Sequence, residues 1–190
     1  MTRPRSVAEI KAKLLRPATT NHFSVNITLP SGLREILPSY NQDDLNLMCS
    51  DASLPGHRLA TFEATNDRYG VTERHAYRKV HDDEMSLTFY VDEEKYLPIR
   101  VFEGWMAFIT NEGPDANNKN YSYKVKYPDQ YRTSMEIYKF EKDYDTKVTY
   151  QFDECYPTSI ASTPVSYSDQ NNLLKYTVGF SYIKYRTFIQ

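Results

Sequence analysis

Short runs in which apolar and polar residues alternate recur along this chain. In residues 22–29 the apolar members are Phe23, Val25, Ile27 and Leu29, and the residues between them are polar. A period of two places the apolar side chains on one face of an extended strand, so the run predicts a half-buried strand. Similar runs predict strands around Met85, Leu87, Phe89 and Val91, over residues 134–140, around Val148, Tyr150 and Phe152, and over residues 173–188.

Weaker patterns add further expected strands. They are centred on Leu45, Leu47 and Cys49, on residues 58–64, and on Tyr121, Tyr123, Val125 and Tyr127. The 17 tyrosines support β structure, because tyrosine favours a half-buried pleated surface. Roughly seven strands with one main helix make a mainly β fold, and we predict a β-sandwich or barrel.

Two segments have the spacing of helices. The main helix is expected at residues 98–109, where Pro98 suits a first turn and apolar residues recur at intervals of three and four. These residues are Ile99, Phe102, Trp105, Met106 and Ile109. Trp105 is the only tryptophan, and we expect it to anchor the core under the sheet. A short N-terminal helix is expected at residues 6–15, where Ser6 and Glu9 match a capping box.

The length and the apolar content suit one hydrophobic core. We therefore expect a single domain over residues 1–190, with 40% hydrophobic content. Residues 1–20 would form an N-terminal arm or helix, and residues 65–84 a protruding hairpin or loop. Within the latter, residues 69–81 mix both charge signs with tyrosine and cannot build a core. They predict either a two-stranded arm that reaches a neighbouring copy or a floppy surface hairpin.

Charge and hydropathy exclude several classes of protein. The net charge of −2 gives no bulk attraction for phosphate, which argues against tight nucleic-acid binding. No apolar stretch approaches the length of a membrane span, and the N-terminus lacks the apolar core of a signal peptide. Cys49 and Cys155 lie in strand-like runs, so buried thiols are expected in place of a disulfide.

Residues that could carry chemistry are scattered. His22, His57, His75 and His81 lie in different segments without the spacing of metal ligands. The acidic run Asp82-Asp83-Glu84 could hold a cation in principle, but such runs usually guard a strand edge. The chain has no nucleophile-elbow motif, glycine-rich phosphate loop or C-x-x-C pair. We expect no catalytic, cofactor or metal residues, and no enzyme.

The tyrosines leave one binding function open. Tyr123-Lys124-Val125-Lys126-Tyr127 and Tyr182-Ile183-Lys184-Tyr185-Arg186 mix aromatic and basic residues, as single-strand binding platforms do. A strand with one packed and one wet face predicts the same mixture. A carbohydrate- or nucleic-acid-binding β-sandwich that uses exposed tyrosines therefore remains an alternative.

Three stretches together resemble one known family. Arg16-Pro17, followed by Asn21-His22-Phe23-Ser24-Val25, resembles an R-P-N-x-F-x-V entry into a first strand, with three extra residues here. Residues 49–56 resemble that family's strand-ending turn before a long hairpin. Residues 155–160, 165–167 and 173–185 are similar to its W-P-T-x-I or W-P-T-x-V turn and final strand, with Tyr156 in place of the usual tryptophan. In this order they resemble the tail tube family of contractile bacteriophages and related injection machines.

The resemblance implies a structural role in a virion. It implies a homo-hexameric ring whose strands form a continuous barrel around a channel, stacked rings, and DNA that passes without specific binding. It also implies a tail sheath protein and a baseplate tube initiator as partners, and a phage tail assembled in the host cytoplasm. Expected contact residues are Tyr69, Arg74, Tyr77, Arg78 and Lys79 in the arm and Tyr182 and Tyr185 in the final strand, and Asp82, Asp83 and Glu84 are expected to face the lumen. Tube-initiator rings share this fold, so that function remains an alternative.

Overall fold

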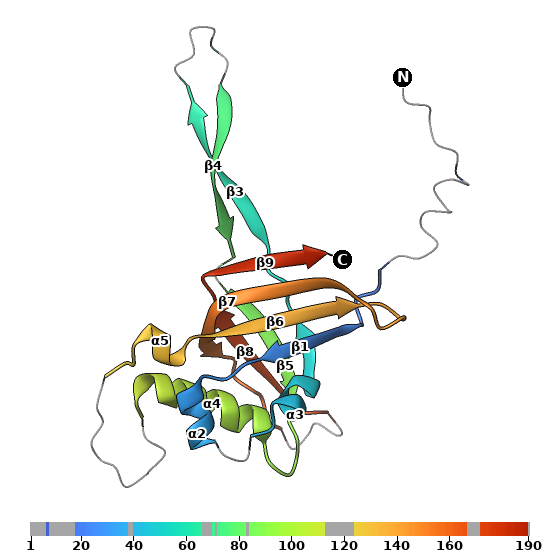
Figure 1. The fold of residues 1–190 in the computed structure, drawn as a ribbon, viewed down its shortest axis with the longest axis vertical. Coiled ribbons are helices and arrows are strands. Elements are labelled where there is room, and N and C mark those ends of the chain that lie inside the picture. The colour runs from blue at the N-terminus through green and yellow to red at the C-terminus, as the bar shows by residue number, and fades with distance from the viewer. Residues whose placement is uncertain are drawn as a thin grey trace.

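The computed structural model describes residues 7, 18–37, 40–65, 70, 72–82, 84–112, 124–166 and 172–189. The strands are β1 Phe23–Ile27, β2 Cys49–Ala52, β3 His57–Ala64, β4 Glu73–His81, β5 Glu84–Tyr90, β6 Thr133–Phe140, β7 Thr146–Ile160, β8 Lys175–Ser181 and β9 Lys184–Ile189. The helices are α2 Ser31–Ile36, α3 Gln42–Leu47, α4 Leu97–Thr110 and α5 Pro128–Tyr131. The fold is mainly β with antiparallel sheets, which confirms the predicted class (Figure 1).

Strand β7 organises both sheets, because two strands pair along one of its edges. Its earlier part pairs with β9 and its later part with β8, in one register: Asp153 opposes Lys184 and Tyr156 opposes Ser181. The Ile183 N–H bridges the two parts by donating to the Asp153 carbonyl at 3.2 Å. Between them Glu154 has φ +55°, a left-handed backbone that bends the strand. The single strand expected over residues 173–188 is therefore present with one interruption.

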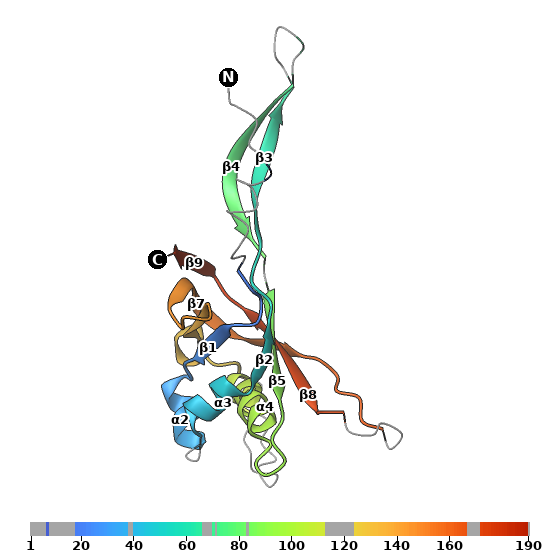
Figure 2. The same ribbon diagram turned by 90° about the vertical axis from the view of Figure 1, so that its right-hand side faces the viewer.

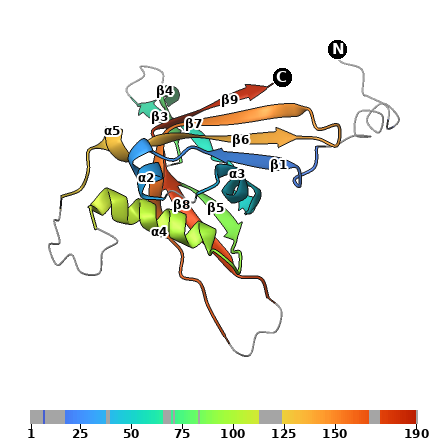
Figure 3. The same cartoon turned by 60° about the horizontal axis from the view of Figure 1, so that its bottom comes forward.

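The bend in β7 separates two sheets that share this strand. In the first sheet the order is β1, β6, β7 and β9, and in the second it is β7, β8, β5 and β2. Helix α4 packs on one face of the second sheet, where the Phe102 ring lies 4.9 Å from Phe89 and 5.7 Å from Phe180 (Figure 3). This arrangement leaves the opposite face of the second sheet uncovered by helix α4.

The core forms where the two sheets and α4 meet. Trp105 is fully buried, and its Nε1–H donates to the Tyr131 carbonyl at 3.1 Å, which satisfies the indole without water. The prediction of a tryptophan anchor under the sheet is confirmed. The alternating residues of the strands supply the rest, among them Val25, Ile27, Met85, Leu87, Phe89, Met135, Ile137, Phe152, Val178 and Phe180. Each such side chain contributes about 1.5–3 kcal/mol on burial.

The strand expected around Leu45 and Leu47 is wrong. These residues lie in α3, where Leu45 is buried and Leu47 is 83% exposed. The Asn41 side chain caps this helix by accepting from the Asp43 N–H at 3.2 Å, and the acidic first turn suits the positive end of the helix dipole. A strand begins only at Cys49.

The strand expected over residues 121–127 is also not found where the structure describes it. Residues 124–127 have no regular secondary structure and lead into α5, which starts at Pro128. In place of strand pairing, Lys126 contacts the end of α4. Its N–H donates to the Ile109 carbonyl, and its Nζ lies 3.2 Å from the centre of the Phe108 ring. Tyr121, Tyr123 and the helix expected at residues 6–15, apart from Val7, lie outside the described residues.

A long two-stranded hairpin, β3 and β4, projects from the body (Figure 2). The protruding hairpin of the predicted fold is therefore present. The strand expected at residues 58–64 belongs to this hairpin, where it pairs with β4. The polar composition of residues 69–81 indicated the protrusion. The sequence pattern of residues 58–64 predicted a strand but did not show that this strand pairs with β4 inside the arm.

Candidate assembly surfaces

The hairpin, which we call the arm, exposes large apolar side chains. Phe62 is 51% exposed and Tyr77 is 59% exposed. Register and ring contacts place five residues on one side of the arm, which we call the arginine face: Arg58, Phe62, His75, Tyr77 and Arg78. In it the Phe62 ring lies 5.4 Å from His75 and 6.4 Å from Tyr77, and Arg78 lies 5.6 Å from the centre of the Tyr77 ring. The arm thus presents aromatic rings beside arginines.

On the opposite side of the arm, Leu59 is exposed and the cations Arg74 and Lys79 have partners within the chain. Arg74 forms a 2.7 Å ion pair with Glu63, and Lys79 lies over the Tyr185 ring at 5.5 Å. Of the expected contact residues, the structure therefore brings Tyr77 and Arg78 together and puts Arg74 and Lys79 on the other side. Tyr69 lies outside the described residues.

The root of the arm is a cluster of two histidines and a tyrosine. His57 opposes His81 on the first rung of the hairpin, and the Tyr185 ring lies 5.0 Å from His81. The His57 Nδ1 lies 2.7 Å from the Tyr185 hydroxyl, which donates to the Pro55 carbonyl at 3.3 Å. Burial lowers the pKa of His81, and the charges of Lys79 and His57 lower it further. Strand β9 thereby fixes where the arm leaves the body.

The expected contact residues of the final strand are buried inside this chain. Tyr182 and Tyr185 are each 7% exposed, and their rings lie 5.2 and 5.9 Å from Phe152. The large apolar side chains that β9 exposes are instead Phe188 and Ile189. Sequence alternation did not reveal the burial of Tyr185, because the break between β8 and β9 changes which residues face the core.

The second sheet has two open edges within the described part of the chain. No described strand pairs with the outer side of β2 or with residues 156–160 of β7 on the side away from β8. In the first sheet, Asn46 of α3 accepts the Ile27 N–H at 3.1 Å at the outer edge of β1, and no described strand pairs with the outer side of β9. Backbone groups are therefore available along both sides of the second sheet.

The uncovered face of the second sheet is lined by small polar residues. Strands β5 and β8 contribute Ser86, Thr88, Thr177, Gly179 and Ser181 to it, and the Thr88 and Thr177 hydroxyls lie 3.0 Å apart. The lysine on this face, Lys175, is neutralised by an ion pair with Asp51 at 3.6 Å. This surface offers hydroxyl groups without an array of cations.

The acidic residues that were expected to face the lumen, Asp82, Asp83 and Glu84, do not form one group in the described part of the chain. Glu84 begins β5 and accepts from the Thr158 hydroxyl at 3.3 Å. The Asp82 carboxylate accepts the Gly56 N–H at 2.8 Å at the root of the arm. Asp83 lies outside the described residues.

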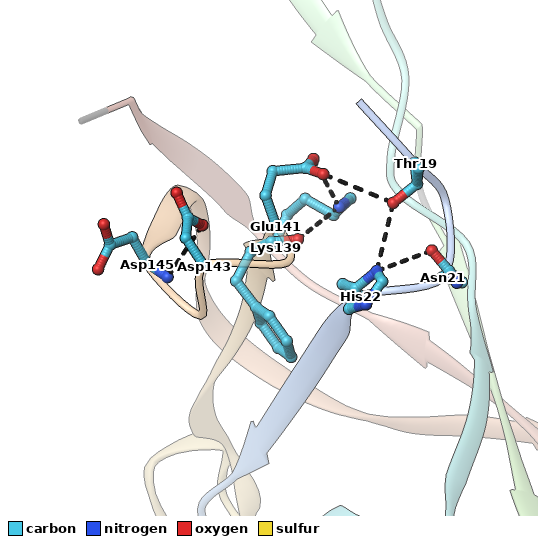
Figure 4. Close-up of polar contacts among 8 residues, drawn as sticks. Thr19, Asn21, His22, Lys139, Glu141, Asp143 and Asp145 are labelled. Atoms are coloured by element: carbon cyan, nitrogen blue, oxygen red, sulfur yellow. Dashed lines mark hydrogen bonds and ion pairs between the residues drawn. The ribbon is translucent and has the colours of Figure 1, made fainter. Parts of the chain in front are cut away.

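A polar cluster holds the entry to β1 against the turn between β6 and β7 (Figure 4). Thr19 contacts both His22 Nδ1 at 3.2 Å and Glu141 at 3.5 Å, and Lys139 donates to Glu141 at 3.1 Å. The bond to Lys139 lowers the pKa of Glu141. These contacts orient the first strand.

Groups suited to catalysis or metal binding are not found in the described residues. No cluster of three His, Cys, Asp or Glu side chains in that part of the chain could hold a metal ion. Cys49 and Cys155 are free thiols, and burial raises the pKa of each to about 12. None of the described helices is long and apolar enough to span a membrane.

Comparisons with known proteins agree on a family. The family model described as phage tail tube protein matches residues 18–188. No curated protein matches the sequence. A structure of the anti-feeding prophage baseplate, six-fold symmetrised, has 13% identity and a TM-score of 0.63, with 91% of this chain and 96% of that chain covered.

Two further structures share the fold. The anti-feeding prophage cap, which terminates its tube, has 15% identity and a TM-score of 0.60 over 92% of this chain and 93% of that chain. A sheath–tube complex of the extracellular contractile injection system PVC has 14% identity and a TM-score of 0.55 over 98% and 100%. The family model covers most of the length of this chain, and the chain therefore belongs to the phage tail tube protein family.

Proposed function

We propose that this chain is a structural subunit of the inner tube of a contractile phage tail or a related injection particle. In this role it forms hexameric rings that stack around a channel. The observation that carries the proposal is the pair of open edges on the second sheet, formed by β2 and by residues 156–160 of β7. Membership of the tail tube family supports the same role.

The two edges are compatible with each other. Neighbouring strands of the second sheet alternate in direction from β7 through β8 and β5 to β2, so its two edges run in opposite directions. Residues 156–160 of one copy and β2 of the next would then pair antiparallel and continue the alternation. Such a contact between two different edges closes into a ring when the rotation closes. The baseplate structure with the same fold is described as six-fold symmetrised, which suits six copies.

The uncovered face of the second sheet would line the channel. Its serines, threonines and Gly179 offer no cationic array for phosphate, and the chain carries a net charge of −2. DNA would therefore pass without specific binding, with Glu84 on the wall. The proposed role is structural and needs no enzymatic activity.

The arm would reach the adjacent ring, and a sheath protein and a baseplate tube initiator would be the other partners. A second candidate function is such an initiator or a terminal ring. It is favoured by the higher TM-scores to the baseplate and cap structures, 0.63 and 0.60, than to the sheath–tube complex, 0.55. Copy number separates the two, because a tube subunit is present in many stacked rings and an initiator in one.

Proline at the outer edge of β2 tests the ring contact. The Ser53 N–H donates to the Ser86 carbonyl at 3.0 Å, so by alternation the Ala52 N–H points away from β5. Ala52→Pro removes that outward donor without removing a bond inside the sheet. Electron microscopy should show rings or tubes for the wild type and for Ala52→Ser, and monomers for Ala52→Pro. A wild-type protein that stays monomeric at high concentration contradicts the proposed function.

A further inference from the structure

The arm and the far end of the body carry opposite charges. From this we infer that the arginine face of the arm docks on the acidic end of a second copy, an inference that rests on the proposed function. The acidic end consists of Asp43 and Asp44 in α3, Glu93 and Glu94 in the turn before α4, and the exposed Leu47. It is the surface that receives the arm.

A backbone hydrogen bond links the two parts of the acidic end. The Tyr90 N–H donates to the Met48 carbonyl at 2.9 Å, which joins the end of β5 to the residue after α3. The turn that contains Glu93 and Glu94 follows β5 directly. Asp92 is occupied, because it caps α4 by accepting from the Lys95 and Leu97 N–H groups, both at 2.7 Å.

The carboxylates of the acidic end form no ion pair in the part of the chain that the structure describes. Within the residues that the structure describes, neither Glu93 nor Glu94 forms an ion pair, and Lys95 is the cation of their turn. Leu47, 83% exposed, lies in α3 with Asp43 and Asp44. An exposed leucine with acidic neighbours matches a partner that brings aromatic rings and cations together.

The arginine face has the complementary character. Of the acidic residues that the structure describes in the arm, Glu63 lies on the other side, where it pairs with Arg74 at 2.7 Å, and Glu73 pairs with His75 at 3.0 Å. Arg58 and Arg78 form no ion pair in the described part of the chain. They flank Phe62 and Tyr77, whose rings remain exposed and whose ring contacts in the described residues come from the arm itself.

The positions of the two surfaces select a second copy as the occupant. The arm lies at one end of the long axis of the molecule, and α3 with the turn before α4 lies toward the other end (Figures 1 and 2). A chain therefore cannot cover its own arginine face with its own acidic end. Copies that repeat along this axis bring the two together at every step, and a contact between different surfaces generates an open stack.

Charge reversal tests the pairing. Arg58→Glu/Arg78→Glu should form rings that do not stack, and so should Glu93→Arg/Glu94→Arg, with at least about a tenfold higher protein concentration needed for tubes. Mixing the two variants should restore tubes, because each acidic arm then meets a basic end and each basic arm an acidic end. Lys124→Glu/Lys142→Glu makes the same change of charge as the arm variant, at exposed residues elsewhere, and should assemble normally.

The outcomes separate this inference from the proposed function. A wild type without rings overturns both. Wild-type tubes, together with normal tubes from either reversed variant, overturn only the docking of the arginine face, and so does a mixture that fails to stack. Thermal unfolding midpoints equal to the wild type show that the variants are folded. Wild-type stacking should also weaken as salt rises from low to physiological concentration, because exposed charges are screened over about 8 Å.

Discussion

The hydroxyl of Tyr185 lies 2.7 Å from Nδ1 of His57, and this contact ties the last strand of the body to the first residue of the arm. The same hydroxyl donates to the Pro55 carbonyl, which belongs to the turn that leads into β3. One side chain therefore fixes the direction in which the arm leaves the body. A tube subunit needs this direction to be constant, because every arm has to meet the next ring at the same place.

Removing this hydroxyl should loosen the arm without unfolding the body. Tyr185→Phe keeps the ring in the core and removes both hydrogen bonds, so we expect a loss of about 1 kcal/mol in the free energy of unfolding. Urea denaturation measures the loss, and hydrogen exchange should become faster at His57 and Arg58. Tyr150→Phe, at a ring 6.3 Å from Tyr185, is the control and should leave exchange in the arm unchanged. Unchanged exchange in Tyr185→Phe would show that the hydroxyl does not hold the arm.

The root of the arm should weaken in mild acid. The pKa of His81 is lowered in the folded protein, so the folded state favours neutral His81. The unfolded chain binds a proton first, and stability should fall as the pH drops below about 6.5. Charged and titratable groups around His81 are His57, Arg58, Lys79, Asp82, Glu84 and Tyr185.

The measurement is the thermal unfolding midpoint between neutral pH and pH about 5. His81→Gln removes the titrating group and should make the pH dependence shallower than that of the wild type. His75→Gln changes a histidine farther out on the arm, in contact with Glu73 at 3.0 Å, and is the control. Equal slopes for wild type and His81→Gln would exclude His81 as the source.

The tryptophan should dominate the stability of the core. Trp105→Ala removes a fully buried ring that contacts Phe180 and leaves the Tyr131 carbonyl without its donor. We expect a loss of about 3–5 kcal/mol, measured by urea denaturation. Met106→Ala, on the half-buried side of the same helix, should cost much less. A loss below 1 kcal/mol, on the order of a surface substitution, would contradict the packing described for α4.

The thiols should be unreactive while the chain is folded. Burial raises the pKa of Cys155 to about 12, so the thiolate is a negligible fraction at pH 8, and the side chain is 1% exposed. A chromogenic thiol reagent should therefore react with Cys155 only after the protein is unfolded in denaturant. Cys49→Ser isolates this residue from the half-buried second thiol. Rapid reaction of native Cys49→Ser would mean that β7 opens at Cys155.

The sequence predicts most of the strands and misses how they pair. Alternation identifies β1, β5 and β6, because one face of each strand is buried and the other is not. It fails at Leu45 and Leu47, where a spacing of two falls on a short helix. Asn41 followed by Asp43 and Asp44 was the available signal for that helix, since these residues suit a capped and acidic N-terminus.

The assembly surfaces were predicted only in part. The polar composition of residues 69–81 indicated an arm, and Tyr77 and Arg78 do lie together on it. Tyr182 is in phase with the buried Tyr176, Val178 and Phe180, so alternation indicated a core position for it, whereas Tyr185 could not be assigned, because it follows the break at Ile183. The open edges of β2 and β7 depend on strand order, which comes from contacts between segments far apart in the sequence.

The most direct test of the account is a cryo-electron microscopy map of the assembled wild-type protein at a resolution that separates strands. We predict a ring in which β2 of each copy pairs antiparallel with residues 156–160 of its neighbour, with Thr88 and Thr177 facing the channel. A ring in which these two edges face solvent, or in which the Thr88 face points outward, would contradict it.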